Sequence, residues 1–197
     1  MTTKDRIFEA VQARLGGATE SFLENEYNDA VMEYFQRSTV FRFRQDITLR
    51  SGKTSYPLTI PSGAHLSQIL FAGDTSSQLR AVPSFVQGMA GADIMTFDGA
   101  SNILRLREAP SEERIMTILL ILSPERGAII PEYLLLQEYE GLKDLLLSRM
   151  YAIPQRPWTS EKLAGYHGKR AVRAISEAQR IVNRGYGSAN WSFPAFT

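Results

Sequence analysis

Three features of this chain could take part in chemistry: a Gly-Lys-Thr triplet, two histidines and a pair of adjacent glutamates. Gly52-Lys53-Thr54 has the ending of a phosphate-binding loop. That loop also needs a glycine five residues before Gly52, where Ile47 stands, and a helix after it, which Pro57 opposes. We therefore interpret the triplet as a turn that connects two strands.

The histidines and glutamates do not form a recognisable catalytic set. His65 falls in a predicted loop without a partner, and His167 is predicted on the polar, solvent-facing side of a helix. Glu112-Glu113 falls in a turn, where solvated charge is the ordinary explanation. An enzyme needs a nucleophile or base and stabilising groups that meet at one place. We therefore predict no enzymatic activity, no catalytic residue and no cofactor.

The absence of cysteine narrows the chemistry further. Without cysteine the chain has no disulfide, no cysteine zinc site, no thiolate nucleophile and no iron–sulfur cluster, and with two histidines we predict no metal site. The longest apolar run, residues 115–122, has about half the length that a membrane-spanning helix needs. The first residues lack the apolar core of a signal peptide. We expect a soluble protein that is made inside the cell and has no membrane partner.

The charge of the chain is balanced overall but unevenly distributed. Its 197 residues include 22 Lys and Arg and 21 Asp and Glu, a net charge of +1. Residues 159–184 hold six basic residues against two acidic ones, and residues 37–53 hold five against one. Such segments can contact phosphate or form salt bridges in an oligomer, although a solvated surface explains the same charges. The candidates for a DNA channel or for inter-subunit ion pairs are Arg42, Arg44, Lys169, Arg170 and Arg173.

Hydrophobic periodicity predicts helices towards both ends of the chain. Apolar residues recur every three or four positions over residues 4–14 and again over residues 21–37, where Ser21 and Glu24 fit a capping box. A last long helix is predicted over residues 159–184. Its apolar stripe is predicted to comprise Leu163, Tyr166, Ala171, Ala174, Ile175, Ala178 and Ile181.

A further helix, predicted over residues 131–152, is apolar on most of its sides. A helix of this kind is buried on all sides, either inside the fold or between subunits. The candidate residues of a subunit interface on it are Tyr139, Leu142 and Leu146.

Between the helical segments, apolar and polar residues alternate, which is typical of strands with one exposed face. Phe41 and Phe43 alternate with Arg42 and Arg44, with a slip near Asp46, and similar short runs continue to residue 122. We predict a small antiparallel β-sheet or barrel of five to seven strands. The predicted fold class is therefore α+β: a helical bundle from residues 1–38 and 131–184, with residues 39–124 as an inserted β region.

The last segment, residues 185–197, has no period and contains two glycines and a proline, so we predict an extended tail. It nevertheless carries four aromatic residues, which are the candidates for docking onto a partner. These are Tyr186, Trp191, Phe193 and Phe196. The alternative is that the tail folds back over its own subunit.

The order of these motifs resembles a known family. An early helix ends in aromatic and arginine residues (Tyr34, Phe35, Phe41 and Arg42), and a strand then leads into the segment Gly52-Lys-Thr-Ser-Tyr56-Pro-Leu58. Later come Ile130-Pro131-Glu132-Tyr133, a leucine-rich helix, and Pro157-Trp158-Thr-Ser-Glu-Lys-Leu163. A basic, alanine-rich helix then ends in Arg184-Gly185-Tyr186. This order is similar to that of head-to-tail adaptor, or connector, proteins of tailed bacteriophages, and the similarity covers most of the chain.

The resemblance implies a structural role in the virion neck and no enzymatic activity. In that family many copies, typically twelve, form a ring beneath the portal that continues the DNA channel into the tail. The implied partners are the portal protein, a tail nozzle, stopper or tube protein, further copies of the chain, and genomic DNA in transit without sequence readout. The implied location is the neck of the virion, after synthesis in the bacterial host cytoplasm. The alternatives are a nonspecific nucleic-acid-binding module, or another neck or tail component such as a stopper or tail-tube protein.

Overall fold

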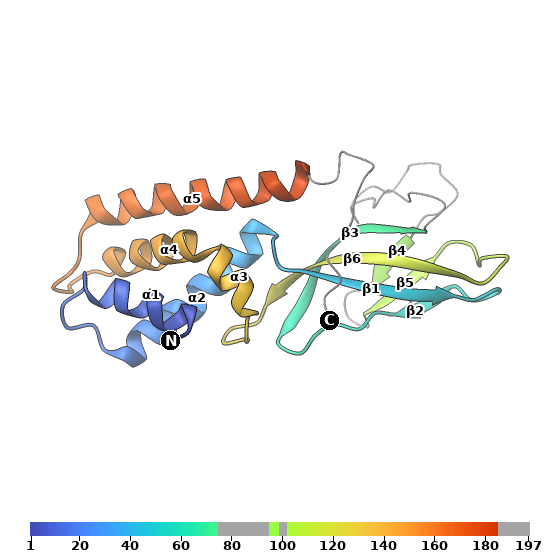
Figure 1. Cartoon of the computed structure of the whole chain (residues 1–197), viewed down its shortest axis with the longest axis horizontal. Coiled ribbons are helices and arrows are strands. Elements are labelled where there is room, and N and C mark those ends of the chain that lie inside the picture. Colours follow the sequence, from blue (N-terminus) through green and yellow to red (C-terminus); the bar gives the residue numbers. More distant parts are fainter. Residues whose placement is uncertain (75–94, 99–101, 185–197) are drawn as a thin grey trace. The chain divides into compact units, whose positions relative to one another are not determined.

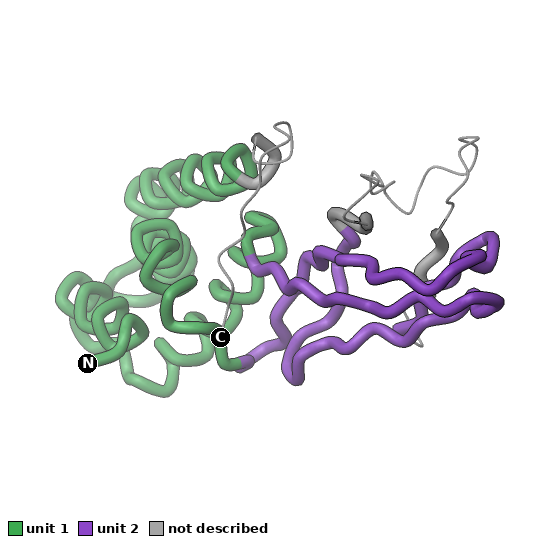
Figure 2. Tube along the Cα trace, turned by 45° about the vertical axis from the view of Figure 1, so that its right-hand side comes forward, with its two compact units in different colours: residues 1–40, 129–197 green, residues 41–128 purple. Residues whose placement is uncertain are grey.

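The computed structural model describes residues 1–74, 95–98 and 102–184, and in them the chain is a mixture of helices and antiparallel sheets (Figure 1). The predicted tail and two parts of the predicted β region, residues 75–94 and 99–101, lie outside the described residues. The chain divides into two compact units (Figure 2). The first unit contains residues 1–40 and the chain from residue 129 onward, and the second contains residues 41–128.

Five helices make up the described part of the first unit. They are α1 (Thr3–Gln12), α2 (Glu20–Ser38), α3 (Glu132–Gln137), α4 (Tyr139–Ala152) and α5 (Glu161–Arg184). The capping box lies at the start of α1, where the Thr2 hydroxyl accepts from the Asp5 backbone N–H and the Asp5 carboxylate accepts from that of Thr2. The capping box predicted at Ser21 is wrong, because the N-cap residue of α2 is Thr19, two residues earlier.

The helix predicted over residues 131–152 is divided into α3 and α4 at Glu138, whose backbone leaves the helical region with φ −98° and ψ 13°. The Glu138 carboxylate is buried and accepts a hydrogen bond of 2.6 Å from the Tyr34 hydroxyl on α2. Burial, together with this hydrogen bond, raises the pKa of Tyr34. The Tyr34 ring also lies against Gly141, where a Cβ atom would be 2.5 Å from the hydroxyl oxygen. Only glycine therefore leaves room for the tyrosine at this crossing of α2 and α4.

The core of the helical unit lies around α4, which packs against α5, α2 and α1 (Figure 1). The four helices contribute apolar side chains that are almost fully buried. They include Ile7, Val11, Leu23, Tyr34, Phe35, Leu142, Leu146, Leu147, Met150, Ala171 and Ile175. The prediction of burial on all sides holds only in part: α4 is largely buried against helices of the same chain, whereas α3 exposes Tyr133 and Leu136.

The second unit contains six described strands in two three-stranded antiparallel sheets. They are β1 (Arg42–Leu49), β2 (Ser55–Pro57), β3 (Ala64–Asp74), β4 (Met95–Asp98), β5 (Ile103–Leu106) and β6 (Arg114–Pro124). One sheet has the order β1-β6-β3 and the other the order β2-β5-β4. In the described part of the chain the strands therefore form small open sheets and no closed barrel.

The first strand follows the predicted alternation without interruption. β1 pairs with β6 in continuous register from Arg42 opposite Ile121 to Leu49 opposite Arg114, so the slip predicted near Asp46 is wrong. The irregularities lie instead in β3, between residues 66 and 71. Phe41 and Phe43 pack against the core of this unit. Its buried members are Ile47, Leu49, Tyr56, Leu58, Leu104, Met116, Ile118, Leu120 and Leu122.

The Gly-Lys-Thr triplet lies in a turn between β1 and β2, as predicted. Gly52 has a φ of +76°, which glycine adopts without steric cost, and the Lys53 N–H donates to the Arg50 carbonyl. The Tyr56 hydroxyl closes the turn by donating to the Lys53 carbonyl at 2.8 Å and accepting from the Arg50 N–H at 3.0 Å. The backbone N–H groups of Arg50 and Lys53 and the Lys53 carbonyl therefore form hydrogen bonds within the turn.

Candidate interaction surfaces of the helical unit

Helix α5 has one narrow buried side and a broad exposed one. His167, Ala171, Ile175 and Ala178 recur at spacings of three or four residues and form the buried side, which packs on α4. Leu163, Tyr166 and Ile181, which the apolar periodicity assigned to that side, are 40 %, 53 % and 61 % exposed.

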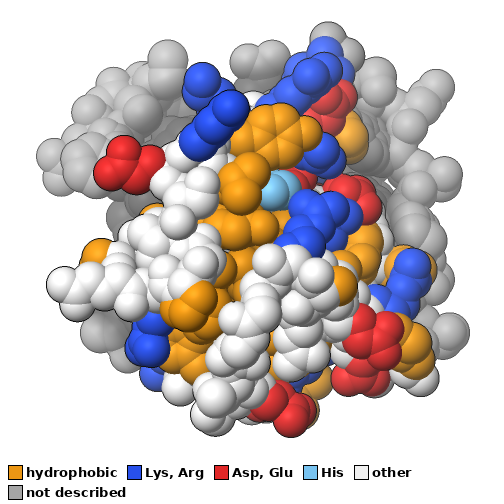
Figure 3. Space-filling view, turned by 90° about the vertical axis from the view of Figure 1, so that its left-hand side faces the viewer, with side chains coloured by type: hydrophobic (Ala, Val, Ile, Leu, Met, Phe, Trp, Pro, Cys, Tyr) orange, Lys and Arg blue, Asp and Glu red, His pale blue; other side chains and the backbone are white. Residues whose placement is uncertain are grey.

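Most of the basic residues of α5 lie on the side opposite the buried one. At about 100° of rotation per residue, Lys162, Lys169, Arg173 and Arg180 fall within an arc of about 40°. All four are exposed, and we call them the basic stripe. Figure 3 shows blue Lys and Arg side chains along the upper edge of this end of the protein, where α5 runs in Figure 1. Two of the sequence-predicted charge candidates, Lys169 and Arg173, thus belong to one surface.

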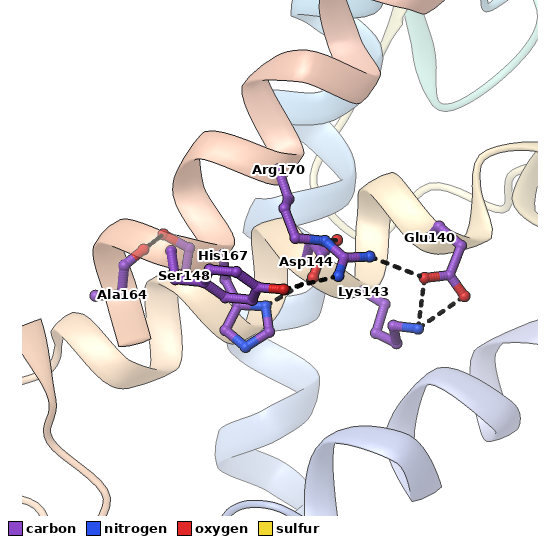
Figure 4. Close-up of polar contacts among 8 residues, drawn as sticks. Glu140, Lys143, Asp144, Ser148, Ala164, His167 and Arg170 are labelled. Carbon is purple, nitrogen blue, oxygen red and sulfur yellow. Dashed lines mark hydrogen bonds and ion pairs between the residues drawn. The ribbon is translucent and has the colours of Figure 1, made fainter. Parts of the chain in front are cut away.

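The third candidate on this helix, Arg170, has a structural role. Its Nε donates to Asp144 Oδ2 at 2.8 Å, and the other oxygen of that carboxylate lies 2.7 Å from His167 Nδ1 (Figure 4). Arg170 also donates to the Tyr166 hydroxyl, and this hydrogen bond, followed by the charge of Asp144, raises the pKa of Arg170. Asp144 and His167 are 3 % and 4 % exposed, so the prediction of a solvent-facing His167 is wrong. The Asp144 carboxylate on α4 allows His167 to be buried, because it provides a hydrogen-bond partner for the Nδ1 atom of the imidazole ring.

The histidine–aspartate pair could serve catalysis only with a reactive group on the other ring nitrogen. Ser148, one turn beyond Asp144 on α4, donates its hydroxyl to the Ala164 carbonyl at 2.9 Å (Figure 4). The His167 ring instead stacks on Tyr151, with centroids 5.7 Å apart and planes at 15°. Both carboxylate oxygens of Asp144 on α4 thus contact α5, one at His167 and the other at Arg170, and these polar contacts join the two helices.

Replacing the central carboxylate of this network should destabilise the helical unit. Asp144→Asn preserves the volume but removes the charge and turns an N–H donor towards either His167 or Arg170. We expect a loss of about 1–3 kcal/mol in the free energy of unfolding. Urea denaturation followed by circular dichroism measures this loss.

Glu140→Gln is the matched control, because Glu140 is on the same helix and its carboxylate is mostly exposed, 3.7 Å from Arg170. Exposed ion pairs contribute about 0–1 kcal/mol, so this variant should unfold nearly as the wild type does. Equal stability of Asp144→Asn and Glu140→Gln would show that the buried network does not hold α5 in place.

A second charged cluster joins α4 to α2 and was not predicted. Arg149 lies 3.0, 3.4 and 3.3 Å from carboxylate oxygens of Glu26, Asp29 and Glu33. The three acids recur at i, i+3 and i+7 and therefore share one side of α2. That spacing was present in the sequence, but the arginine that meets it is more than a hundred residues away.

The interface candidates on the leucine-rich helix lie mainly inside the subunit. Leu142 and Leu146 are 1 % and 0 % exposed in the single chain, so they offer no apolar surface to a neighbouring copy. The Tyr139 ring contacts two cations, with Lys143 Nζ 5.0 Å and the Arg6 guanidinium 5.2 Å from its centroid.

Exposed apolar side chains occur at and before α3 as well as on α5. Tyr133 and Leu136 are 51 % and 55 % exposed at neighbouring positions on one side of this helix, and Ile129, just before it, is 97 % exposed. We call Tyr133 and Leu136 the α3 apolar face. Apolar surface of this kind marks an interaction site more often than isolated exposed residues do.

The remaining candidates lie in the strands and in the tail. Arg42 and Arg44 are on the side of β1 opposite the core residues Ile47 and Leu49, and Arg44 Nε lies 3.5 Å from Asp46 Oδ1. Both groups of that pair are about half exposed, so it contributes little stability. Tyr186, Trp191, Phe193 and Phe196 lie outside the described residues.

Among the residues that the structure describes, no three His, Asp or Glu side chains are grouped so that they could hold a metal ion. None of the described helices combines the length and the apolar character needed to cross a membrane. Comparisons with protein-family models and with curated proteins found no match. The exposed charges and exposed apolar side chains of the helical unit are the surfaces described above that a partner could contact.

Proposed function

We propose that this protein is a structural adaptor of a phage virion neck, which forms a ring between the portal and the tail and continues the DNA channel. The observation that carries the proposal is that one helical unit exposes both an α3 apolar face and a basic stripe on α5. A subunit of a DNA-conducting ring needs both a surface for its neighbours and a surface compatible with a polyanion. The order of sequence motifs supports the same assignment.

In this proposal the two units have different tasks. The helical bundle contributed by both chain ends, residues 1–38 and 131–184, builds the ring and meets the portal, and the inserted β region, residues 39–124, faces the tail. Because a ring repeats one heterologous contact, the α3 apolar face meets a different surface on the next copy. The copy number that the resemblance implies is twelve. The further partners are a nozzle, stopper or tube protein on the tail side, and the virion neck is the location.

The experiment is negative-stain electron microscopy of the purified protein mixed with the portal protein of the same phage. We expect rings seated on portals for the wild type and few or none for Leu136→Asp, because a carboxylate in the apolar contact must be desolvated without a partner. Ile115→Asp is the matched control, since Ile115 is 61 % exposed and belongs to the strand unit.

Failure of the wild type to form rings on portals would contradict the adaptor proposal. Normal rings of Leu136→Asp would show instead that the subunits meet through another surface. A free protein with high affinity for DNA and no affinity for portals would favour the alternative, a nonspecific nucleic-acid-binding module. Assembly on tail components alone would favour a stopper or tail-tube protein.

A further inference from the structure

The residues of the basic stripe on α5 form few ion pairs with the described part of the chain. Arg180 lies 2.6 Å from Glu177, whereas Lys162, Lys169 and Arg173 form no ion pair with any residue that the structure describes. Arg170, which is rotated away from the stripe, carries the contacts that hold α5 on α4. Like charges along one side of a helix repel one another unless an anion lies opposite them.

The spacing of the stripe fits an extended anion better than a compact one. Successive members of the stripe are separated by seven, four and seven residues, which correspond to about 10, 6 and 10 Å along the helix axis. From Lys162 to Arg180 the stripe therefore extends over about 27 Å. A single phosphate group could reach only one or two of these side chains. Duplex DNA, with about one negative charge per 1.7 Å of its axis, offers phosphates to all of them.

The residues beside the stripe differ between its two sides. Gly165 and Ser176 are small and exposed on one side, and Tyr166, which is 53 % exposed, is about 40° from the centre of the stripe on the other. Glu161 and Glu177, the two acids of the helix, are rotated by about 60° or more from the centre of the stripe. Lys and Arg contacts to phosphate position a protein on DNA but carry no sequence information.

We propose that the exposed side of α5, through Lys162, Lys169, Arg173 and Arg180, contacts the phosphodiester backbone of double-stranded DNA without sequence preference. This inference rests on the proposed function in one respect, since the channel of the ring supplies the duplex. It assigns the DNA contact to one side of one helix and excludes Arg170 from it. The contact is weak for a single copy and is repeated by each subunit.

The test compares two double variants of the full chain that change the net charge equally. Lys169→Glu/Arg173→Glu alters the stripe, and Arg14→Glu/Arg107→Glu alters exposed arginines in the first and second unit respectively. Binding to a fluorescent duplex of mixed sequence is measured by anisotropy over a series of salt concentrations. We expect the stripe variant to lose about tenfold in affinity at low salt and to reduce the salt slope by about 2, with little change for the control.

Equal losses for both variants would overturn the inference, because net charge alone would then explain the binding. Unchanged DNA binding with failed ring assembly would also overturn it, since the stripe would then meet an acidic protein surface. Rescue of binding by Lys169→Arg/Arg173→Lys would support it. Ring assembly on portals is scored separately. Stripe-dependent DNA binding without any rings would sustain the inference while the adaptor proposal fails.

Discussion

Leu142→Asp should abolish the native fold of the single subunit and with it every higher assembly. The side chain is 1 % exposed, on the helix that packs against α1, α2 and α5. Losing a buried leucine costs about 2–5 kcal/mol, and burying a carboxylate without a partner adds to this cost. The sum is comparable to the whole stability of a typical domain, about 5–15 kcal/mol. Circular dichroism and size-exclusion chromatography of the dilute protein measure the outcome.

The matched control is Leu136→Asp, the same change six residues earlier on α3, where the side chain is 55 % exposed. We expect this variant to melt within a few degrees of the wild type, because substitutions on the surface usually change stability by about 0.5 kcal/mol or less. A folded, monomeric Leu142→Asp that fails only in ring assembly would place Leu142 at the subunit interface and contradict the packing described for α4. Leu142→Ala, with a smaller expected loss of about 2–5 kcal/mol, keeps the comparison measurable if the charged variant is not recovered.

Deletion of residues 188–197 should abolish docking onto the portal while the monomer keeps its melting temperature. The deleted segment contains Trp191, Phe193 and Phe196, and aromatic side chains commonly dominate protein interfaces. Pro194 restricts the chain and lowers the entropic cost of ordering it on a partner. Co-sedimentation with portals and differential scanning calorimetry measure the two quantities separately.

The full-length variant Trp191→Ala/Phe193→Ala is the matched control for the deletion, because it preserves the length and backbone of the tail. We expect it to dock at least tenfold more weakly than the wild type, since truncating two aromatic anchors costs about 2 kcal/mol each at an interface hot spot. A large drop in the melting temperature of the truncated monomer, with docking intact, would mean that the tail folds back over its own subunit. The portal contact would then belong to the helices.

The sequence by itself determined the elements whose signal is local. Helices at both ends and strands in the middle follow from hydrophobic periods that a segment carries regardless of its neighbours. The turn at Gly52 follows from the proline after it and from a missing glycine at Ile47, both within a few residues. The side of β1 that faces the core follows from its alternation.

The tertiary structure alone decided where the polar residues of α5 point. Sequence periodicity predicts that His167 faces the solvent, because burying an unpaired histidine is costly. Its partner Asp144 is 23 residues away on another helix, so the sequence does not reveal the pairing. Glu138, where the helix breaks, likewise has its buried carboxylate paired with a distant residue, since it accepts a hydrogen bond from the Tyr34 hydroxyl on α2. Most buried polar groups have a hydrogen-bond partner, and a partner on a distant segment leaves no period in the sequence. The basic residues of α5 therefore form a single cluster in the sequence but have two roles in the fold. Arg170 contacts Asp144 on α4, whereas the residues of the basic stripe are exposed.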